Sequence, residues 1–424
     1  MAEQMRVWII KTGEPVPHLP AESGDRLFRA GLMAQTLHER GHHVTWWTGC
    51  FHHQLKIMRD VVHSTPVRPN PDGPEMIFLP SKGYKRHISP ARFIDHAQIR
   101  RAFTRLAPLQ TRPDVILCAW PTIDLAFAAV QFGRAHNIPV VLDIRDLWPD
   151  IFYERITAKT GLPFKNYFLP WERMGKRAVQ GADALISITG GMLEWGQHRF
   201  ARETTKRDRV FHQSQSATQM REDLGFWAER GVDLDAPKTR LVWAGTLISD
   251  LDIQTLLKAI EALPEAAARE LEFVFCGSGD LSPRIEQMAE RLPHVVFGGW
   301  VSQNALNALY ARSHIGLMCY LDRFDFQLSI PNKVADFTRS ELRVLTNLKG
   351  EMQRVLGSED LLISYPTGDA EALCARLVEI AEDPAHYRSP APKARALFER
   401  QFDAHVVMSE FADYIEQIAH EGCT

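Results

Sequence analysis

The sequence predicts an α/β protein of two doubly wound domains, each a parallel sheet with helices on both faces. Three observations lead to this prediction. Short runs rich in valine, isoleucine and leucine alternate with segments of helical periodicity, a pattern typical of parallel sheets wrapped by helices. The alternation stops in a polar stretch at about 204–238 and then starts again. A chain of 424 residues is also longer than one hydrophobic core usually organises.

The expected strands are short apolar runs, and both halves of the chain contain them. In the first half they lie at 6–10, 44–48, 76–79, 115–119, 140–143 and 184–188. In the second half they lie at 241–244, 272–276, 295–297, 315–318, 344–346 and 361–364. Helices are expected between them, for example at 25–40, 253–263 and 281–291. Gly41 is expected to end the first of these helices.

The polar stretch is interpreted as the linker between the domains. The first domain is expected to cover 1–215 and the second 216–401. The segment 405–421 has the periodicity of an amphipathic helix but no strand of its own to cover, so 402–424 is expected to cross back to the first domain. Ligands of doubly wound sheets bind at the carboxyl ends of the strands, so functional residues are expected in loops after strands, on both sides of a cleft.

Composition excludes several classes of protein. A net charge of −3 provides no overall attraction to nucleic acid. The six cysteines are scattered without a C-x-x-C pair, which favours a reduced, cytoplasmic protein over a disulfide scaffold or a zinc site. No run of about 18 apolar residues could span a membrane, and the first apolar run is too short for the core of a signal peptide.

Two glycine-containing turns of the second domain are candidates for nucleotide binding. The sequence GSGD at 277–280 follows the strand at 272–276, and GT at 245–246 follows the strand at 241–244. Glycine lets the backbone approach a ligand closely, and a helix start offers free N–H groups and a partial positive charge. An ordinary strand-to-helix turn has the same sequence features, so this alternative stays open.

The stretch SIPNKVADF at 329–337 is the sharper signal. Pro331 suits a helix start, and Asn332 is a good cap. The helix-start N–H groups and the Lys333 ammonium would both oppose the charge that develops on a departing nucleoside diphosphate. Asp336, one turn later, would accept hydrogen bonds from a sugar or ribose hydroxyl. The competing interpretation is an ordinary capped helix with a surface lysine.

The order of these motifs resembles the nucleotide-sugar half of glycosyltransferase family 4 enzymes. The resemblance implies the GT-B fold, in which two Rossmann-like domains face a cleft, and a P-x-K-x-x-E-Y-like stretch that binds the diphosphate and the ribose. Leu328 and Asp336 take the places of the family's usual paired glutamates. The turn after Gly245 lacks the family's Arg and Lys, so Lys333 is expected to carry more of the phosphate neutralisation.

In the first domain the sequence DIRDLWPD at 143–150 follows an expected strand. It resembles the R-D-L-W-P segment of a subgroup that includes the fucosaminyltransferases of O-antigen and capsule assembly. Asp146 is expected to contact the acceptor or the transferring proton. Arg145 and Trp148 either bind the acceptor or only shape the loop, through an Arg–Asp ion pair and through packing. Trp120, at another strand end, is expected to help line the cleft.

Two further segments resemble the family more loosely. A loop after the first strand contains Gly24 and Asp25, and in the family such a loop approaches the donor phosphates and the acceptor. The junction around His42 looks like the family's R-G-H-x-V-T sequence, and His42 is interpreted as a structural loop residue rather than a catalytic one.

The expected site therefore has three groups of residues. The donor-binding group is Gly24, Gly245, Thr246, Gly277, Gly279, Asp280, Ile330, Pro331, Asn332, Lys333 and Asp336. The acceptor-binding group is Asp25, Trp120, Arg145, Asp146 and Trp148. The catalytic group is Asp146, Lys333 and Asp336. No metal ligand is expected, because no D-x-D lies in a suitable loop and cationic groups would do the work of a metal.

The segment 82–112 contains many bases and a single acid, Asp95, with aromatic residues between them. Anionic lipid attracts a surface Lys or Arg by about 1 kcal/mol each, so this segment could dock reversibly on an anionic membrane. A solvated helix face is the alternative, and RNA binding is disfavoured because no RNA-binding motif is present.

The sequence thus predicts a retaining glycosyltransferase that moves a sugar from a nucleotide-sugar, UDP-linked by default, to a lipid-linked or other glycan acceptor in bacterial surface polysaccharide biosynthesis. It is expected in the cytoplasm, at the inner face of the membrane, without a cofactor. Two alternatives remain: a UDP-sugar 2-epimerase of the same fold, and a non-catalytic partner that binds the sugar nucleotide.

Overall fold

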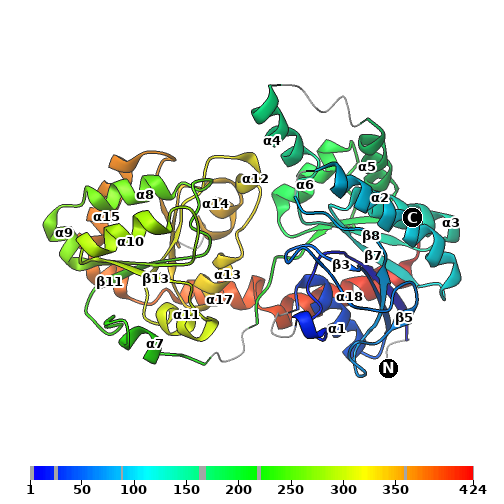
Figure 1. Ribbon diagram of the computed structural model, residues 1–424, viewed down its shortest axis with the longest axis horizontal. Coiled ribbons are helices and arrows are strands. Elements are labelled where there is room, and N and C mark those ends of the chain that lie inside the picture. Colours follow the sequence, from blue (N-terminus) through cyan, green and yellow to red (C-terminus); the bar gives the residue numbers. More distant parts are fainter. Residues whose placement is uncertain are drawn as a thin grey trace. The chain divides into compact units, whose positions relative to one another are not determined.

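A computed structural model of the chain describes residues 4–22, 27–86, 89–161, 169–216, 221–357 and 361–423 (Figure 1). It divides into two compact units. Unit 1 comprises Met1–His212 and Val407–Thr424, and unit 2 comprises Gln213–Val406. Each unit is an α/β structure built around its own sheet.

The sheet of unit 1 has the strand order β10-β9-β8-β7-β1-β2-β6-β5. The strands are β1 (Arg6–Ile10), β2 (His43–Gly49), β5 (Pro66–Val67), β6 (Glu75–Leu79), β7 (Val115–Trp120), β8 (Val140–Ile144), β9 (Ala184–Ser187) and β10 (Arg209–Val210). The edge strand β5 pairs antiparallel with β6, and the other pairs are parallel. The chain builds outward from β1 through β2 and β6, then returns to β7 on the other side of β1. The topological switch point therefore lies between β1 and β7.

Helices cover both faces of this sheet. They are α1 (Arg29–Glu39), α2 (Pro90–Leu106), α3 (Ile123–His136), α4 (Asp150–Thr160), α5 (Leu169–Gly181), α6 (Gly190–Arg199) and α18 (Ala404–Glu421), with the short turns η1 (Pro20–Glu22) and η2 (Ala107–Leu109). Successive residues of β1 point to opposite faces. Ile9 accordingly packs in one core with α1 and α18, whereas Trp8 stacks on Phe132 of α3 with ring centroids 5.2 Å apart. A small hairpin, β3 (Phe51–His52) and β4 (Ile57–Met58), follows β2.

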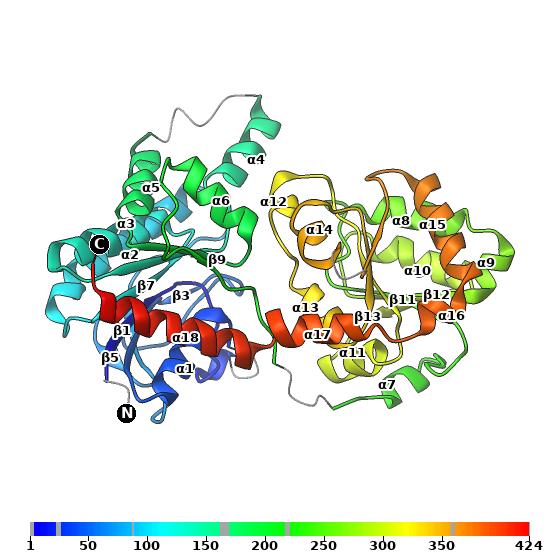
Figure 2. The same cartoon turned by 180° about the vertical axis from the view of Figure 1, so that it is seen from behind.

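The C-terminal helix α18 belongs to unit 1, as the fold-class prediction expected. Figures 1 and 2 both show it beside α1. Phe411 stacks on Phe211 with centroids 4.6 Å apart, and Arg40 donates to Asp413 at 2.6 Å and to Glu416 at 2.8 Å. The apolar stripe read from the sequence is therefore buried against the first sheet.

The sheet of unit 2 has the order β13-β12-β11-β14-β15-β16, and all its pairs are parallel. Its strands are β11 (Thr239–Ala244), β12 (Leu271–Cys276), β13 (Val295–Gly299), β14 (Ile315–Met318), β15 (Arg343–Thr346) and β16 (Leu362–Ser364). By the same reasoning its switch point lies between β11 and β14. Alternate residues of the strands enter two cores, Val242 and Val274 on one face, Leu241 and Phe273 on the other.

The helices of unit 2 fill the connections between these strands. They are α7 (Gly225–Ala228), α8 (Ile253–Glu261), α9 (Glu265–Glu270), α10 (Ser282–Arg291), α11 (Gln303–Tyr310), α12 (Phe324–Gln327), α13 (Lys333–Arg339), α14 (Gly350–Leu356), α15 (Ala370–Glu382), α16 (Pro384–Arg388) and α17 (Pro392–Gln401). None of the helices in the described ranges is long and apolar enough to cross a membrane.

The boundary between the two units falls at 212/213, inside the stretch 204–238 interpreted as the linker, but parts of this stretch belong to the units themselves. Val210 in β10 extends the first sheet by pairing with Ser187 of β9. Trp227 is completely buried in the core of unit 2, where its indole N–H donates to the carbonyl of Ala305 at 2.8 Å. The sequence did not indicate these elements, because each is very short and most residues around it in the chain are polar.

Candidate active site

A pocket of about 330 Å³ lies at the carboxyl ends of the central strands of unit 2. The loops after β11, β12 and β13 and the start of α13 contribute to it. The polar and aromatic residues of its lining include Gly245, Thr246, Gly277, Ser278, Trp300 and Lys333. Four predicted donor-binding residues thus come together here, from segments far apart in the sequence.

The glycines are required because two loops approach each other closely. Gly277 has φ +135°, and a Cβ on it would lie 1.7 Å from the carbonyl oxygen of Gly245. A Cβ on Gly279 would lie 2.1 Å from the carbonyl oxygen of Leu247. The amide of Leu247 in turn donates to the carbonyl of Ser278 at 3.0 Å, so the two loops are hydrogen-bonded to each other.

Asp280 stabilises this loop pair. Its carboxylate accepts hydrogen bonds from the hydroxyl and the amide of Ser249, at 2.7 and 3.1 Å. The bond from the Ser249 side chain lowers the pKa of Asp280. Neither Asp280 nor Gly279 lines the pocket. For Gly279 and Asp280 the structure thus shows the role of an ordinary strand-to-helix turn, which the sequence left open as the alternative to nucleotide binding.

Helix α13 carries Lys333 into the pocket. Gly316 in β14 leaves space for Phe337, because a Cβ there would lie 2.2 Å from the Phe337 ring. The helix can therefore lie directly against the sheet. Lys333, its first residue, then extends over Gly245, with its Cε 4.0 Å from where a Cβ of Gly245 would be. Lys333 is the one charged residue among the described residues that line this pocket.

The rest of the stretch 329–337 differs from expectation. Asn332 occupies the N-cap position but its side chain makes no capping hydrogen bond, because its own backbone is already helical (φ −54°, ψ −26°) and its oxygen is not directed at the following amides. Asp336 is 8% exposed, and Arg339 donates to its carboxylate at 3.2 Å. Ile330 is part of the core. These three residues and Pro331 do not line the pocket.

A second pocket, of about 170 Å³, lies in unit 1 at the switch point of its sheet. The loops after β1, β2, β6, β7 and β8 and the helix α2 form it. The polar side chains of its lining are those of Lys11, Thr12, His53, Tyr84, Arg92, Asp95, His96, Thr122 and Asp146. Of the predicted acceptor-binding residues that the structure describes, Asp146 alone lines it.

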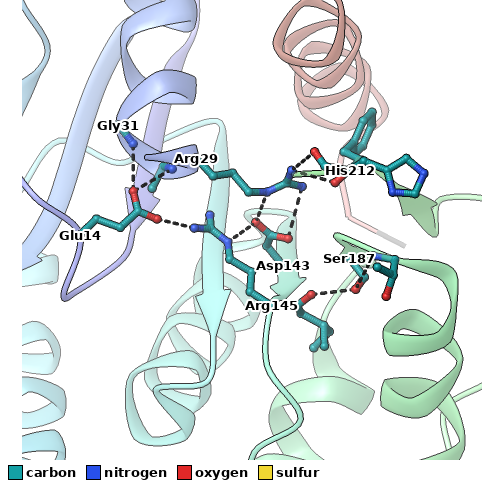
Figure 3. Close-up of polar contacts among 11 residues, drawn as sticks. Glu14, Arg29, Gly31, Asp143, Arg145, Ser187 and His212 are labelled. Carbon is teal, nitrogen blue, oxygen red and sulfur yellow. Dashed lines mark hydrogen bonds and ion pairs between the residues drawn. The ribbon is translucent and has the colours of Figure 1, made fainter. Parts of the chain in front are cut away.

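Arg145 belongs to a buried ion-pair network instead (Figure 3). It donates to Asp143 at 2.6 Å and also pairs with Glu14. Arg29 donates to the same Asp143 carboxylate at 2.9 Å and to the carbonyl of Phe211 at 2.8 Å. Asp143 is fully buried, and although burial acts in the opposite direction, the charges of Arg145 and Arg29 hold its pKa below the usual value. The Arg–Asp ion pair that the sequence left open for Arg145 is therefore present, and Arg145 is not among the residues that line the pocket of unit 1.

The two predicted tryptophans also have structural roles. Trp120 is completely buried, and its indole N–H donates to the carbonyl of Trp148 at 2.9 Å, so it does not line a cleft. Trp148 is 8% exposed, stacks on Phe152 with centroids 5.5 Å apart, and has the Arg92 guanidinium 4.1 Å from its ring. In the structure Trp148 packs under the loop, which is one of the two alternatives that the sequence left open.

The sequence interpretation missed Lys11 and His96. Lys11 directly follows β1, and burial, with the nearby charge of Arg145, lowers its pKa despite the opposing effects of Glu14 and Asp146. Burial and the charge of Arg92 lower the pKa of His96 to about 3, so its imidazole is neutral. The available signal was the position of Lys11, a charged residue immediately after a buried strand at the switch point.

The remaining residues singled out in the first domain are Gly24, Asp25 and His42. Gly24 and Asp25 lie outside the described residues. His42 is 4% exposed, accepts from the amide of Met5 at 3.3 Å and lies 3.1 Å from Glu416, as a structural loop residue would.

The basic segment 82–112 is less uniform than its sequence. Its exposed bases are Lys82, Lys85, Arg86, Arg101, Arg105 and Arg112. Arg92 turns inward, Arg100 lies 3.9 Å from Asp124, and Tyr84 and Phe103 are buried. Among the described parts of the chain, His, Cys, Asp and Glu side chains form no group of three or more that could hold a metal ion.

Comparisons with known structures agree with this architecture. Sucrose-phosphate synthase from Thermosynechococcus elongatus is similar with a TM-score of 0.68 at 14% identity, over 98% of this chain and 99% of that chain. HepE from Anabaena in complex with UDP has a TM-score of 0.65 at 10% identity, over 98% and 100%. WaaG, a glycosyltransferase involved in lipopolysaccharide biosynthesis, has a TM-score of 0.57 at 15% identity, over 97% and 99%. Identities this low show a shared fold.

Sequence families identify the chemistry. A family described as Glycosyl transferase 4-like domain matches residues 29–205, and one described as Glycosyl transferases group 1 matches residues 238–383. No curated protein matches the chain in sequence. The two family matches cover unit 1 and unit 2 in turn and together span more than half of the chain. The chain is therefore a glycosyltransferase with the GT-B fold.

Proposed function

We propose that this enzyme transfers a sugar, with retained anomeric configuration, from a nucleotide-sugar to a lipid-linked glycan acceptor in bacterial surface polysaccharide biosynthesis. The observation that carries the proposal is the pocket of unit 2, where Lys333 extends over the glycine turns at Gly245 and Gly277. UDP is the default carrier, and HepE, which shares the fold, has been solved with UDP and with UDP-glucose.

The residues of this pocket have complementary roles in donor binding. The glycine turns let backbone amides approach the diphosphate without a side chain in the way. The Lys333 ammonium opposes the negative charge that grows on the diphosphate as it leaves. Trp300, 79% exposed at the pocket, offers a flat face on which the nucleotide base can stack.

The reaction then needs little further from the protein. The bond from the anomeric carbon to the diphosphate oxygen breaks, the bond to the acceptor oxygen forms on the same face of the sugar, and a diphosphate oxygen takes the acceptor's proton. Asp146 in the pocket of unit 1 would orient the acceptor hydroxyl. This scheme requires neither a metal ion nor a cofactor.

Two observations support an acceptor from surface polysaccharide assembly. The R-D-L-W-P segment at 145–149 resembles that of O-antigen and capsule fucosaminyltransferases, and WaaG, which shares the fold, acts in lipopolysaccharide biosynthesis. A lipid-linked acceptor would place the enzyme in the cytoplasm at the inner face of the membrane. The exposed bases within 82–112 suit an anionic surface there.

The proposal is tested by a thermal-shift screen of nucleoside diphosphates and sugar nucleotides, since a ligand that binds only the folded state raises its melting temperature. UDP and UDP-sugars are expected to raise it. A protein that binds a UDP-sugar and isomerises it without acceptor would instead be an epimerase. The lack of a base after Gly245 and Leu328 in place of a glutamate favour one alternative, a non-catalytic partner, which would bind the nucleotide but turn nothing over.

A further inference from the structure

The β3–β4 hairpin exposes an unusual set of apolar side chains. Phe51 and His52 of β3 are buried, whereas their partners in β4, Met58 and Ile57, are 50% and 41% exposed. Leu55 in the turn is 52% exposed, and Val62 just beyond β4 is 65% exposed. The four residues Leu55, Ile57, Met58 and Val62 are called the hairpin patch below. Exposed apolar residues gathered in this way mark an interaction site more often than chance solvent exposure.

The base of the hairpin is rigidly attached to unit 1. Arg59, 8% exposed, donates to the carbonyls of Gly49 and Glu14 at 2.8 and 2.7 Å and pairs with the buried Glu22 at 2.7 Å. The hairpin patch is thus presented by a fixed support, which lowers the entropic cost of using it for binding.

Exposed bases border this hairpin. The loop after β6 packs on Phe51, since a Cβ on Gly83 would lie 2.4 Å from its ring. Tyr84 in that loop is buried against Phe51 with ring centroids 5.0 Å apart, and the residues around it, Lys82, Lys85 and Arg86, are exposed. Lys56 in the hairpin turn has its ammonium 4.7 Å from the centre of the Tyr84 ring. Apolar and basic side chains therefore share one small region of unit 1.

The same region forms part of the pocket of unit 1. His53 follows β3 and Tyr84 lies in the basic loop, and both line the pocket, where they hydrogen-bond to each other. Arg92 lines it too, with its guanidinium 5.5 Å from the Tyr84 ring. The hairpin and the basic loop therefore both contribute to the wall of this pocket.

We propose that the hairpin patch inserts into the interfacial region of an anionic phospholipid bilayer, with Lys82, Lys85 and Arg86 at the lipid phosphates. This orientation would bring the sugar of a lipid-linked acceptor to the unit 1 pocket. The inference rests on the proposed lipid-linked acceptor. It assigns docking to the hairpin and the loop at 82–86, whereas the bases toward the end of 82–112 have no part in it. Apolar side chains beside bases are the combination that binds such an interface.

The test is co-sedimentation of the full chain with vesicles of phosphatidylethanolamine and phosphatidylglycerol, with phosphatidylcholine vesicles as the neutral comparison. Wild type is expected to bind the anionic vesicles, less strongly as salt rises. The triple variant Leu55→Ser/Ile57→Ser/Met58→Ser should bind on the order of a hundredfold more weakly, because three half-exposed apolar side chains lose their contact with lipid. Leu109→Ser, at a residue 74% exposed elsewhere on unit 1, should bind as wild type does.

A second pair of variants tests the assignment of the bases. Lys82→Gln/Lys85→Gln/Arg86→Gln should lose most of the preference for anionic vesicles, and Arg101→Gln/Arg105→Gln/Arg112→Gln should keep it. Equal losses in both sets, or wild-type binding by the triple apolar variant, would overturn the inference, as would a wild-type chain that ignores anionic vesicles.

Folding and the proposed function are followed separately. Each variant should retain the wild-type melting temperature, because the changed side chains are exposed. Each should also retain its shift with UDP, because none of the changed residues lies in unit 2. A protein that binds vesicles as described but shows no shift with any sugar nucleotide would contradict the proposed function and leave the hairpin inference intact.

Discussion

The change Lys333→Ala tests the proposed donor chemistry most directly. Lys333 is the one charged residue among the described residues lining the unit 2 pocket, and the turn from 245 to 249 contains no base. No other described side chain of that lining can therefore supply its charge. Its loss should affect the leaving diphosphate more than the bound donor, because the negative charge on the bridging oxygen grows as the bond breaks.

The size of the effect follows from this geometry. Removing one donor aimed at developing negative charge typically costs 10²–10³ in kcat, about 3–4 kcal/mol of transition-state stabilisation. A charge-assisted hydrogen bond to the ground-state donor contributes about 1.5–3 kcal/mol, so the Kd for UDP-sugar should rise roughly tenfold or more. Lys333→Arg keeps the charge with a different shape and should recover part of kcat.

The assay is sugar transfer to acceptor-bearing membrane lipid, with UDP release measured in parallel and donor binding followed by calorimetry. Lys258→Ala, at an exposed lysine of α8, is the matched control and should behave as wild type. Turnover by Lys333→Ala within about tenfold of wild type would refute the assignment of leaving-group stabilisation to this ammonium. Wild type that binds donor but shows no turnover with any acceptor would point to the non-catalytic partner.

Three further changes, one of them with a matched control, test the loops, the network and the base-stacking surface. Gly277→Ala should destabilise unit 2 by several kcal/mol in urea unfolding, because its Cβ would lie 1.7 Å from a facing carbonyl oxygen. Gly231→Ala, with φ +69° and nothing within 4 Å, isolates the backbone cost and should lose only about 1 kcal/mol. Arg145→Met should destabilise unit 1 by about 3–5 kcal/mol. Because the folded-state pKa of Asp143 is depressed, wild type should also lose stability as pH falls below about 4 and through that lower pKa, and the variant should show a smaller loss. Trp300→Ala should weaken UDP binding about tenfold with little change in stability, since stacking contributes about 1–3 kcal/mol per base.

Each of these has a result that would contradict it. Equal stabilities of the two glycine variants would mean that the facing loops can separate at little cost. A pH profile for Arg145→Met that parallels wild type would show that the arginine does not hold the carboxylate ionised. An affinity for UDP that is unchanged in Trp300→Ala would exclude base stacking. Binding of uridine and of phosphate, measured separately, shows which part of UDP the substitution affects.

The strands longer than two residues were predictable because each is a mostly buried, apolar run bounded by polar or glycine residues. The run at 272–276 is one example, and the structure extends it by one residue to β12, Leu271–Cys276. The short elements were not predictable, since nothing in the polar surroundings of Trp227 indicated that its ring would be completely buried. Four residues predicted for donor binding line one pocket, and their convergence could be expected because the order of several motifs specified the loops after particular strands.

Several of the predicted acceptor-binding residues have partners inside the protein, and one physical reason explains why the sequence did not reveal all of them. A charge at a strand end suits a ligand or an internal partner equally well, and sequence spacing does not reveal the partner. Arg145 pairs with Asp143, two residues earlier, which the sequence could suggest. Its second partner, Glu14, lies 131 residues earlier in the chain and is brought to it only by the fold. Asp336 is different, because Arg339 lies three residues later on the same helix and such pairs are visible in sequence.

Topology locates both pockets more reliably than motif resemblance does. In each unit the chain first adds strands on one side of its first strand and then adds the remaining strands on the other side. The crossover helices therefore leave one side of the loop after the first strand uncovered. The first residues after β1 and β11 are Lys11 and Gly245, and each lines the pocket described above at the carboxyl ends of the strands of its sheet. Motif resemblance identified Gly245 but did not point to Lys11. The position immediately after the first strand was the better guide, because it follows from the strand order and does not depend on which residue type a relative has there.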